Sequence, residues 1–146
     1  MYGKTPHIGE IMATAQGYSE AKKDLEETFG MVPPPLDTIP EDDAVQEWPT
    51  FKKYVAGESE IPPKYRELIG LAIAANIKCP YCTFFHGAAA ELHGATESEL
   101  QEVYFLSSFT SRYSSMLHAQ QYDLDEFKDK VHQIGGHLQQ ELAADD

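Results

Sequence analysis

Basic side chains are scarce in this chain of 146 residues. Eleven Lys and Arg face 24 Asp and Glu, which gives a formal net charge of −13 at pH 7. A surface of this sign repels the phosphates of nucleic acids and the anionic headgroups of membranes. We therefore expect neither nucleic acid nor a membrane as a partner.

Long apolar runs are also missing. No run approaches the roughly 20 apolar residues that cross a bilayer, and the first seven residues, MYGKTPH, lack the hydrophobic segment of a secretory signal. These absences predict a cytoplasmic protein. At 146 residues the chain is long enough to form a core without disulfide support, so a single domain over 1–146 is predicted.

Cysteine is nearly absent. The chain has two, Cys79 and Cys82, separated by two residues. Two cysteines at this spacing do not form the disulfide framework of a small secreted domain, and they are typical of a cytosolic redox or metal site.

Alternating strand patterns of useful length are absent too, so the predicted fold class is all-α. Capping signals and apolar periodicity predict a helix from Ser19 to Phe29, and the prolines of 31–35 predict an extended connector that is not helical. Further helices are predicted over 40–57, 63–77, 80–93 and 96–107, and a last one is predicted from Asp123 or Asp125 through Leu138.

The two cysteines coincide with a predicted helix start. Proline is well tolerated at the first helical position, so Pro80 places Cys79 at the N-cap and Cys82 in the first turn. The backbone N–H groups and the dipole at a helix N-terminus favour an anion. They lower the pKa of a thiol from its usual value of about 8.5. The pattern therefore predicts a site that forms a thiolate.

Glu67 and His86 flank this site in the sequence. Glu67 lies in a segment, 65–77, that is apolar nearly all round and is predicted to be buried, so its carboxylate needs a partner. His86 lies four residues after Cys82, on the same helical face. If the chain reverses near Lys78, His86 approaches Glu67, and the four side chains form a constellation that can move a proton off a cysteine.

This pattern, Glu67, Cys79-x-x-Cys82 and His86, resembles the signature of the alkylhydroperoxidase D-like branch of the carboxymuconolactone decarboxylase superfamily. The flanking sequences IPPKYREL at 61–68 and HGAT at 93–96 match as well, and the resemblance covers 61–105. It implies an all-α bundle in which an antiparallel helix pair carries the active site. It also implies a homotrimer or homohexamer.

The resemblance further implies a thiol-dependent peroxidase, with a hydroperoxide as substrate and a dithiol or protein as reductant. Cys82 would attack the peroxide, Cys79 would resolve the sulfenic acid to a disulfide, and Glu67 and His86 would relay the proton. No cofactor and no metal are implied, because the cysteines carry the electrons. A carboxymuconolactone decarboxylase activity is less expected, because those enzymes do not rely on a CxxC pair.

The same residues also occur in other kinds of site. A redox-sensing or partner-reducing dithiol protein needs the same thiols and stays open. Glutaredoxin-like proteins share the sequence CPYC but place it after a strand and use a later cis-proline, whereas this chain has no proline after Pro80. A zinc site of the same four residues is disfavoured because three of them follow one another along one helix. The hypothesis that these four are inert core residues is disfavoured, because four side chains of reactive types occur together at this spacing.

Overall fold

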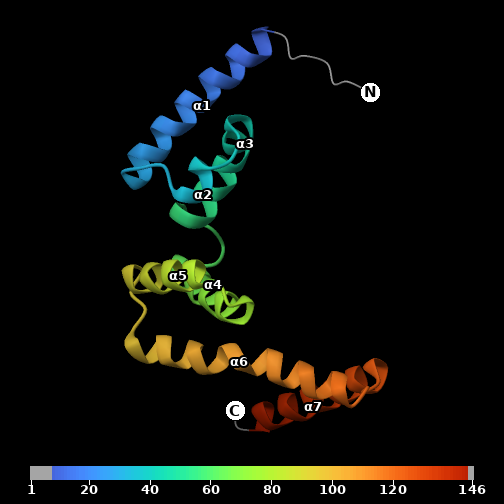
Figure 1. Cartoon of the computed structure of the whole chain (residues 1–146). Coiled ribbons are helices and arrows are strands. Elements are labelled where there is room, and N and C mark those ends of the chain that lie inside the picture. Colours follow the sequence, from blue (N-terminus) through green and yellow to red (C-terminus); the bar gives the residue numbers. More distant parts are fainter. Residues whose placement is uncertain (1–7, 145–146) are drawn as a thin grey trace, which may run out of the picture. The chain divides into compact units, whose positions relative to one another are not determined.

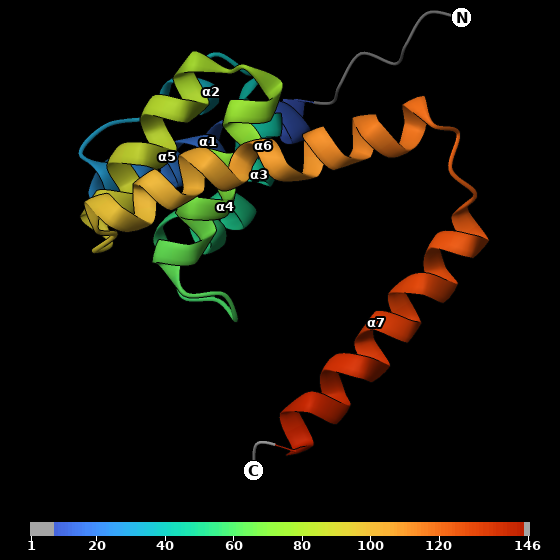
Figure 2. The same cartoon turned by 90° about the horizontal axis from the view of Figure 1, so that it is seen from below.

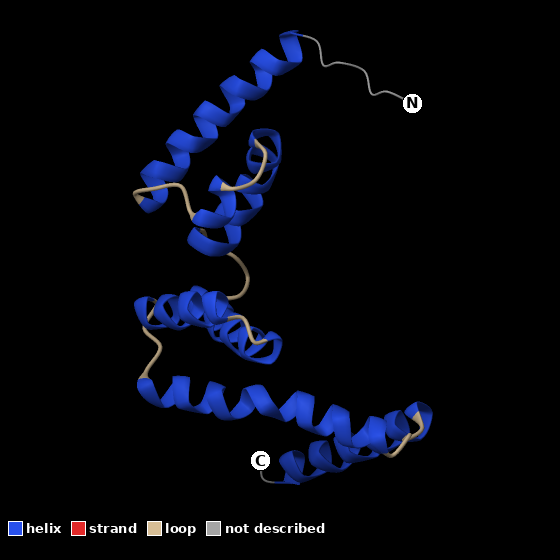
Figure 3. Ribbon diagram, in the orientation of Figure 1, coloured by secondary structure: helices blue, strands red, loops and turns tan. Residues whose placement is uncertain are grey.

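The computed structural model describes residues 8–144, with side chains from residue 17 onward, and this part of the chain contains helices and no strand (Figure 3). The all-α prediction is confirmed. The elements, shown in Figure 1, are α1 (Ile8–Phe29), α2 (Pro34–Asp37), α3 (Glu41–Phe51), the π-helix η1 (Lys52–Ala56), α4 (Pro63–Ile77), α5 (Pro80–Leu92), α6 (Glu97–Ala119) and α7 (Leu124–Ala144).

The chain divides into two compact units, Met1–Pro63 and Lys64–Asp146. In the first unit, Leu25 of α1, Leu36 of α2 and Trp48 of α3 form a buried cluster. The Trp48 indole N–H donates a hydrogen bond of 2.8 Å to Asp24, and the Lys52 ammonium lies 2.6 Å from the same carboxylate. These two groups, Lys52 first, hold the pKa of Asp24 below its usual value. A single polar group therefore joins α1 to the end of α3.

Two predicted features of this unit are wrong. Helix α1 begins at Ile8, so Ser19 lies inside the helix and is exposed there, where a serine is tolerated without capping. The proline segment is helical for one turn, because Pro34 and Pro35 occupy the first helical positions, where no N–H is needed. The turn buries Leu36, which explains why it forms.

The second unit contains the predicted site. Its buried cluster consists of Leu71 from α4, Ala90 from α5 and Leu100 from α6, so three helices share one small core. Gly94, with φ of +84°, ends the segment after α5, and Thr96 begins α6 with the predicted capping box. The core therefore fixes α4 and α5, which carry the four candidate residues, against the start of α6.

The last two helices are longer than their sequences indicate, and they are not interrupted. Helix α6 runs unbroken through its serine-rich part, where hydroxyls such as those of Ser107 and Ser108 donate back to carbonyls one turn earlier. Figure 2 shows α7 as one continuous helix, which includes Gly135 and Gly136. Asp123 caps it by accepting from two backbone N–H groups. None of the described helices combines the length and hydropathy that crossing a bilayer requires.

An ion pair at the start of α4 predicts how stability depends on pH. Lys64 lies 2.7 Å from Glu99, whose other oxygen accepts the backbone N–H of Thr96 at 2.7 Å. Lys64 first, and then the Thr96 N–H, lower the pKa of Glu99 from 4.5 to about 2. A carboxyl whose pKa is depressed by folding stabilises the fold above its unfolded pKa, and this contribution is lost as the pH falls towards the folded value.

We therefore expect Glu99→Gln to lower the free energy of unfolding at pH 6 and to have little effect near pH 2. The difference between the two proteins should shrink as the pH falls from about 4.5 to about 2. Urea unfolding at a series of pH values measures it. Glu102→Gln, an exposed change in the same helix, is the matched control. A Glu99→Gln effect that is the same at every pH would contradict this role of the ion pair.

Candidate active site

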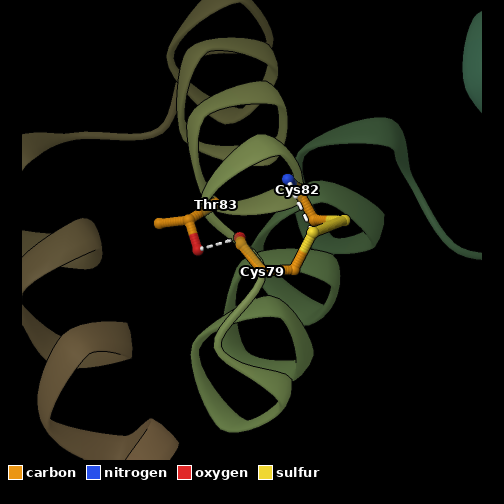
Figure 4. Close-up of a disulfide and its surroundings, with 3 residues drawn as sticks. All are labelled: Cys79, Cys82 and Thr83. Atoms are coloured by element: carbon orange, nitrogen blue, oxygen red, sulfur yellow. Dashed lines mark hydrogen bonds between the residues drawn. A yellow bond between two sulfur atoms is a disulfide. The ribbon is translucent and has the colours of Figure 1, made fainter.

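Helix α5 begins as its proline predicts. Cys79 is the N-cap in an extended conformation, and Pro80 occupies the first helical position. The backbone N–H of Cys82 donates to the Cys79 sulfur at 3.2 Å, and the Thr83 hydroxyl donates to the Cys79 carbonyl at 2.9 Å (Figure 4). The Cys79 sulfur thus takes the place that a serine or aspartate oxygen takes at other helix starts.

The two cysteines are joined as a disulfide, and their Cα atoms lie 5.4 Å apart (Figure 4). Both residues are half-buried. The close pair is therefore held by the first turn of α5 itself, since the residues at an N-cap and at the third helical position face each other.

A two-residue turn connects α4 to α5. Lys78 adopts a left-handed conformation with φ of +57°, and the N–H of Cys79 donates to the Ala74 carbonyl at 3.1 Å. This turn redirects the chain at once, so that the second helix passes close to the first. Besides the shared core of Leu71 and Ala90, the side chain of His86 makes a contact between the two helices.

His86 contacts Glu67 across the two helices. The Nδ1 atom of His86 lies 2.7 Å from an Oε2 atom of Glu67. The Glu67 side chain is 4 % exposed and that of His86 is 28 % exposed. The buried carboxylate thus has the imidazole as its partner. Because Glu67 occupies Nδ1, the other ring nitrogen, Nε2, is the one left to exchange a proton with a neighbour.

The structure therefore brings the four candidate residues together in two pairs. Cys79 and Cys82 form one pair, Glu67 and His86 form the other, and α5 links them. Cys82 and His86 lie one helical turn apart on the same face, where the Cβ atoms are about 5–6 Å from each other. This spacing leaves room for a thiol to reach the imidazole directly or through one water.

The helix N-terminus does not serve the two sulfurs equally. The sequence indicates that both lie near free backbone N–H groups, but the hydrogen bond from the helix start goes to Cys79. The Cys82 sulfur is bonded to that of Cys79. The backbone at the helix start thus contacts the Cys79 sulfur directly, and Cys82 contributes the N–H of that bond.

Sequence reasoning missed Gly70. It lies one turn after Glu67 in α4, and the ring of His86 lies against it so closely that a Cβ atom there would be 2.5 Å from the ring. A glycine inside an otherwise apolar helix is the signal that was available, because glycine weakens a helix and needs a reason to be there.

No group of three or more His, Cys, Asp and Glu residues is arranged to hold a metal ion within the described part of the chain. In that part, Glu67 and His86 bond to each other, and the two cysteines bond to each other. The side-chain atoms of the predicted site that could bind a metal thus contact one another in pairs.

The sequence and the fold were compared with those of known proteins. The family model of the carboxymuconolactone decarboxylase family matches residues 42–122, more than half of the chain. The chain belongs to the carboxymuconolactone decarboxylase family. The match includes all four candidate residues and most of the second unit.

Two individual proteins resemble this family member. A crystal structure of the alkylhydroperoxidase AhpD core from Rhodospirillum rubrum superimposes with a TM-score of 0.64, at 25% identity, and covers 86% of this chain and 95% of that one. An alkyl hydroperoxide reductase of Mycobacterium tuberculosis is 27% identical over 88 residues, which are 59% of this chain and 24% of the relative. The chain thus spans about a quarter of the length of that curated relative. The expected alkylhydroperoxidase D-like fold is confirmed.

Proposed function

We propose that this protein is a dithiol hydroperoxidase, in which Cys82 attacks a hydroperoxide and Cys79 resolves the product. One observation carries the proposal: the buried Glu67 carboxylate bonds His86, which lies one helical turn from the disulfide-bonded cysteine pair. The two similar proteins, named as an alkylhydroperoxidase and an alkyl hydroperoxide reductase, support it.

The first step forms the thiolate. In the reduced protein, Cys82 gives its proton to Nε2 of His86, directly or through one water. Glu67 then faces an imidazolium, whose charge it balances from a site that is only 4 % exposed. A carboxylate in such a site interacts more strongly with a charge than one in water does. Glu67 also fixes the ring orientation through its bond to Nδ1.

The second step consumes the peroxide. The Cys82 thiolate attacks the terminal oxygen of the hydroperoxide, so that an S–O bond forms and the O–O bond breaks. The alkoxide leaves as an alcohol with the proton that His86 holds. Cys82 is oxidised to the sulfenic acid, and the peroxide is reduced by two electrons.

The third step closes the disulfide and the fourth opens it. The Cys79 thiol attacks the Cys82 sulfur, an S–S bond forms, and the sulfenic oxygen leaves as water. The product is the disulfide of the present structure. An external dithiol or a dithiol protein then reduces it by thiol–disulfide exchange and is itself oxidised.

We expect the reduced protein to consume tert-butyl hydroperoxide in proportion to its thiols. A single turnover without reductant should remove one peroxide per chain and two free thiols per chain, and excess dithiothreitol should restore both thiols. Thiol titration and peroxide quantification measure this, with the Cys79→Ser/Cys82→Ser double variant as the control for direct reaction of the dithiol. Failure to consume peroxide, with the disulfide still exchanging with a dithiol, would favour a partner-reducing or redox-sensing protein instead.

We further propose that the protein assembles as a homo-oligomer. Large apolar side chains of the second unit are exposed on the single chain, among them Tyr81 at 85 %, Phe84 at 80 % and Phe105 at 65 %. Exposed apolar area of this kind marks an interaction surface. Light scattering should give three or six times the chain mass of 16.3 kDa, and a monomer at micromolar concentration would contradict the proposal.

A further inference from the structure

Gly70 of α4 lies directly against the imidazole ring of His86 in α5. A Cβ atom at this position would be 2.5 Å from Cε1 and Nδ1 of His86 and 2.7 Å from Nε2. Real Cβ atoms do not approach other heavy atoms so closely. The imidazole thus occupies the space that any side chain at position 70 would need.

The imidazole has little freedom to move away. Its Nδ1 atom is held 2.7 Å from Glu67, which lies three residues before Gly70 on the same face of α4. Shifting the ring outwards to admit a methyl group would stretch or break this bond. A change at position 70 therefore acts on the contact between Glu67 and His86.

Glycine is otherwise a poor choice at this position. Gly70 lies near the middle of α4, where alanine is intrinsically the better helix former. Its φ is not in the left-handed region that only glycine adopts easily, because the positive-φ glycines among the described residues are Gly30 and Gly94. The backbone thus gives no reason for a glycine here, and the close approach of the ring does.

We propose that Gly70 is a positioning residue, whose missing side chain admits the His86 ring to the place where it bonds Glu67 and faces Cys82. The inference rests on the proposed role of His86 in forming the Cys82 thiolate. It concerns the placement of the imidazole, so it can be tested on the ring itself as well as on the thiol.

The first test is Gly70→Ala in the full-length reduced protein. We expect the hydrogen-bonded Nδ1–H signal of His86 in proton–nitrogen NMR spectra to be lost or shifted to that of a solvent-exposed ring. We expect the alkylation rate of Cys82 at neutral pH to fall on the order of tenfold, because a displaced base no longer assists proton transfer. The pH at which this rate is half-maximal should rise.

Gly136→Ala is the matched control. Gly136 lies inside α7, and a Cβ atom there would meet nothing within 4 Å. The same chemical change should therefore leave the His86 signal and the Cys82 rate as they are. It separates the general effect of alanine in a helix from the effect of filling the space beside the ring.

A second variant keeps the inference testable if Gly70→Ala folds poorly. Removing the ring with His86→Ala empties the space, so adding Gly70→Ala to this background should cost no stability and should raise the midpoint of thermal unfolding slightly. A Gly70→Ala penalty that is unchanged in the His86→Ala background would show that Gly70 serves only the packing of the helices, and would overturn the inference.

The NMR signal also separates this inference from the proposed function. If Gly70→Ala displaces the His86 ring but the Cys82 alkylation rate is unchanged, Gly70 positions the ring and the proposed role of the ring is wrong. If the His86 signal and the Cys82 rate both stay as in the parent protein, the positioning role itself is wrong.

Discussion

Cys82→Ser should abolish hydroperoxide consumption, to the level of the dithiol alone. A serine hydroxyl does not form an anion near neutral pH and does not accept the peroxide oxygen, so the first bond-forming step has no nucleophile. The helix start should persist, because position 82 contributes its backbone N–H to the hydrogen bond that the Cys79 sulfur accepts at the N-cap. Helix content by circular dichroism and peroxide loss under excess dithiothreitol measure the two expectations.

Cys79→Ser is the matched change at the other sulfur, and its expected result is different. The variant should still react once with hydroperoxide and accumulate a sulfenic acid at Cys82, because only the resolving thiol is missing. Turnover should stop at that stage. Trapping with a dimedone-type reagent followed by peptide mass spectrometry locates the product. A trapped sulfenic acid at Cys79 of Cys82→Ser, with none at Cys82 of Cys79→Ser, would reverse the two roles.

Glu67→Gln should slow the reaction of Cys82 with iodoacetamide at neutral pH by about a hundredfold, the lower end of the contribution of a positioned base. The amide keeps the shape of the carboxylate but not the charge that balances an imidazolium. Helix-dipole effects near a helix end are about 0.3–1 kcal/mol, less than the roughly 1.36 kcal/mol of one pKa unit. The dipole is therefore too weak to account for a large stabilisation of the thiolate, and most of it must come from Glu67 and His86.

His86→Gln should lower the same rate by a similar factor. The double variant Glu67→Gln/His86→Gln should be little slower than either single variant, because both residues act on one proton and their effects do not add. Additive losses would mean that Glu67 and His86 act on Cys82 separately. The matched substitution His93→Gln, at the C-cap of α5, should leave the rate unchanged.

Local signals predicted the second unit well. Pro80 defines the start of α5, Gly94 ends the segment after it, and Thr96 with Glu99 forms the capping box of α6. Each of these residues acts on backbone within one turn of itself, so the sequence alone carries the information. The contact of His86 with Glu67 followed from burial and helical spacing once the reversal at Lys78 was assumed.

Features that depend on tertiary contacts were not predictable in the same way. The helical turn at Pro34 forms because Leu36 enters the core of the first unit, and proline residues alone do not reveal that core. Helix α1 extends far before Ser19, since serine is a common cap but is also tolerated on an exposed face. The ring against Gly70 is a contact between two helices, and a glycine in a sequence does not show what fills its space.

Two different groups can stabilise a thiolate at this site, one at each cysteine. A hydrogen bond to a charged group contributes roughly 1.5–3 kcal/mol, so the backbone N–H at the Cys79 sulfur competes with the side-chain pair near Cys82. The backbone bond does not involve the side chains of Glu67 and His86, so substitutions at these two residues remove their contribution and leave the bond in place. Comparing the two thiols in one protein therefore separates these sources.

The measurement is the alkylation rate of each cysteine in the fully reduced protein, followed by peptide mass spectrometry across pH 4–10, with Glu67→Gln measured alongside. The account predicts that Cys82 reacts faster than Cys79 at neutral pH, and that Glu67→Gln moves the Cys82 profile to higher pH while the Cys79 profile stays in place. A faster Cys79, or a Cys82 profile that Glu67→Gln leaves unchanged, would contradict it.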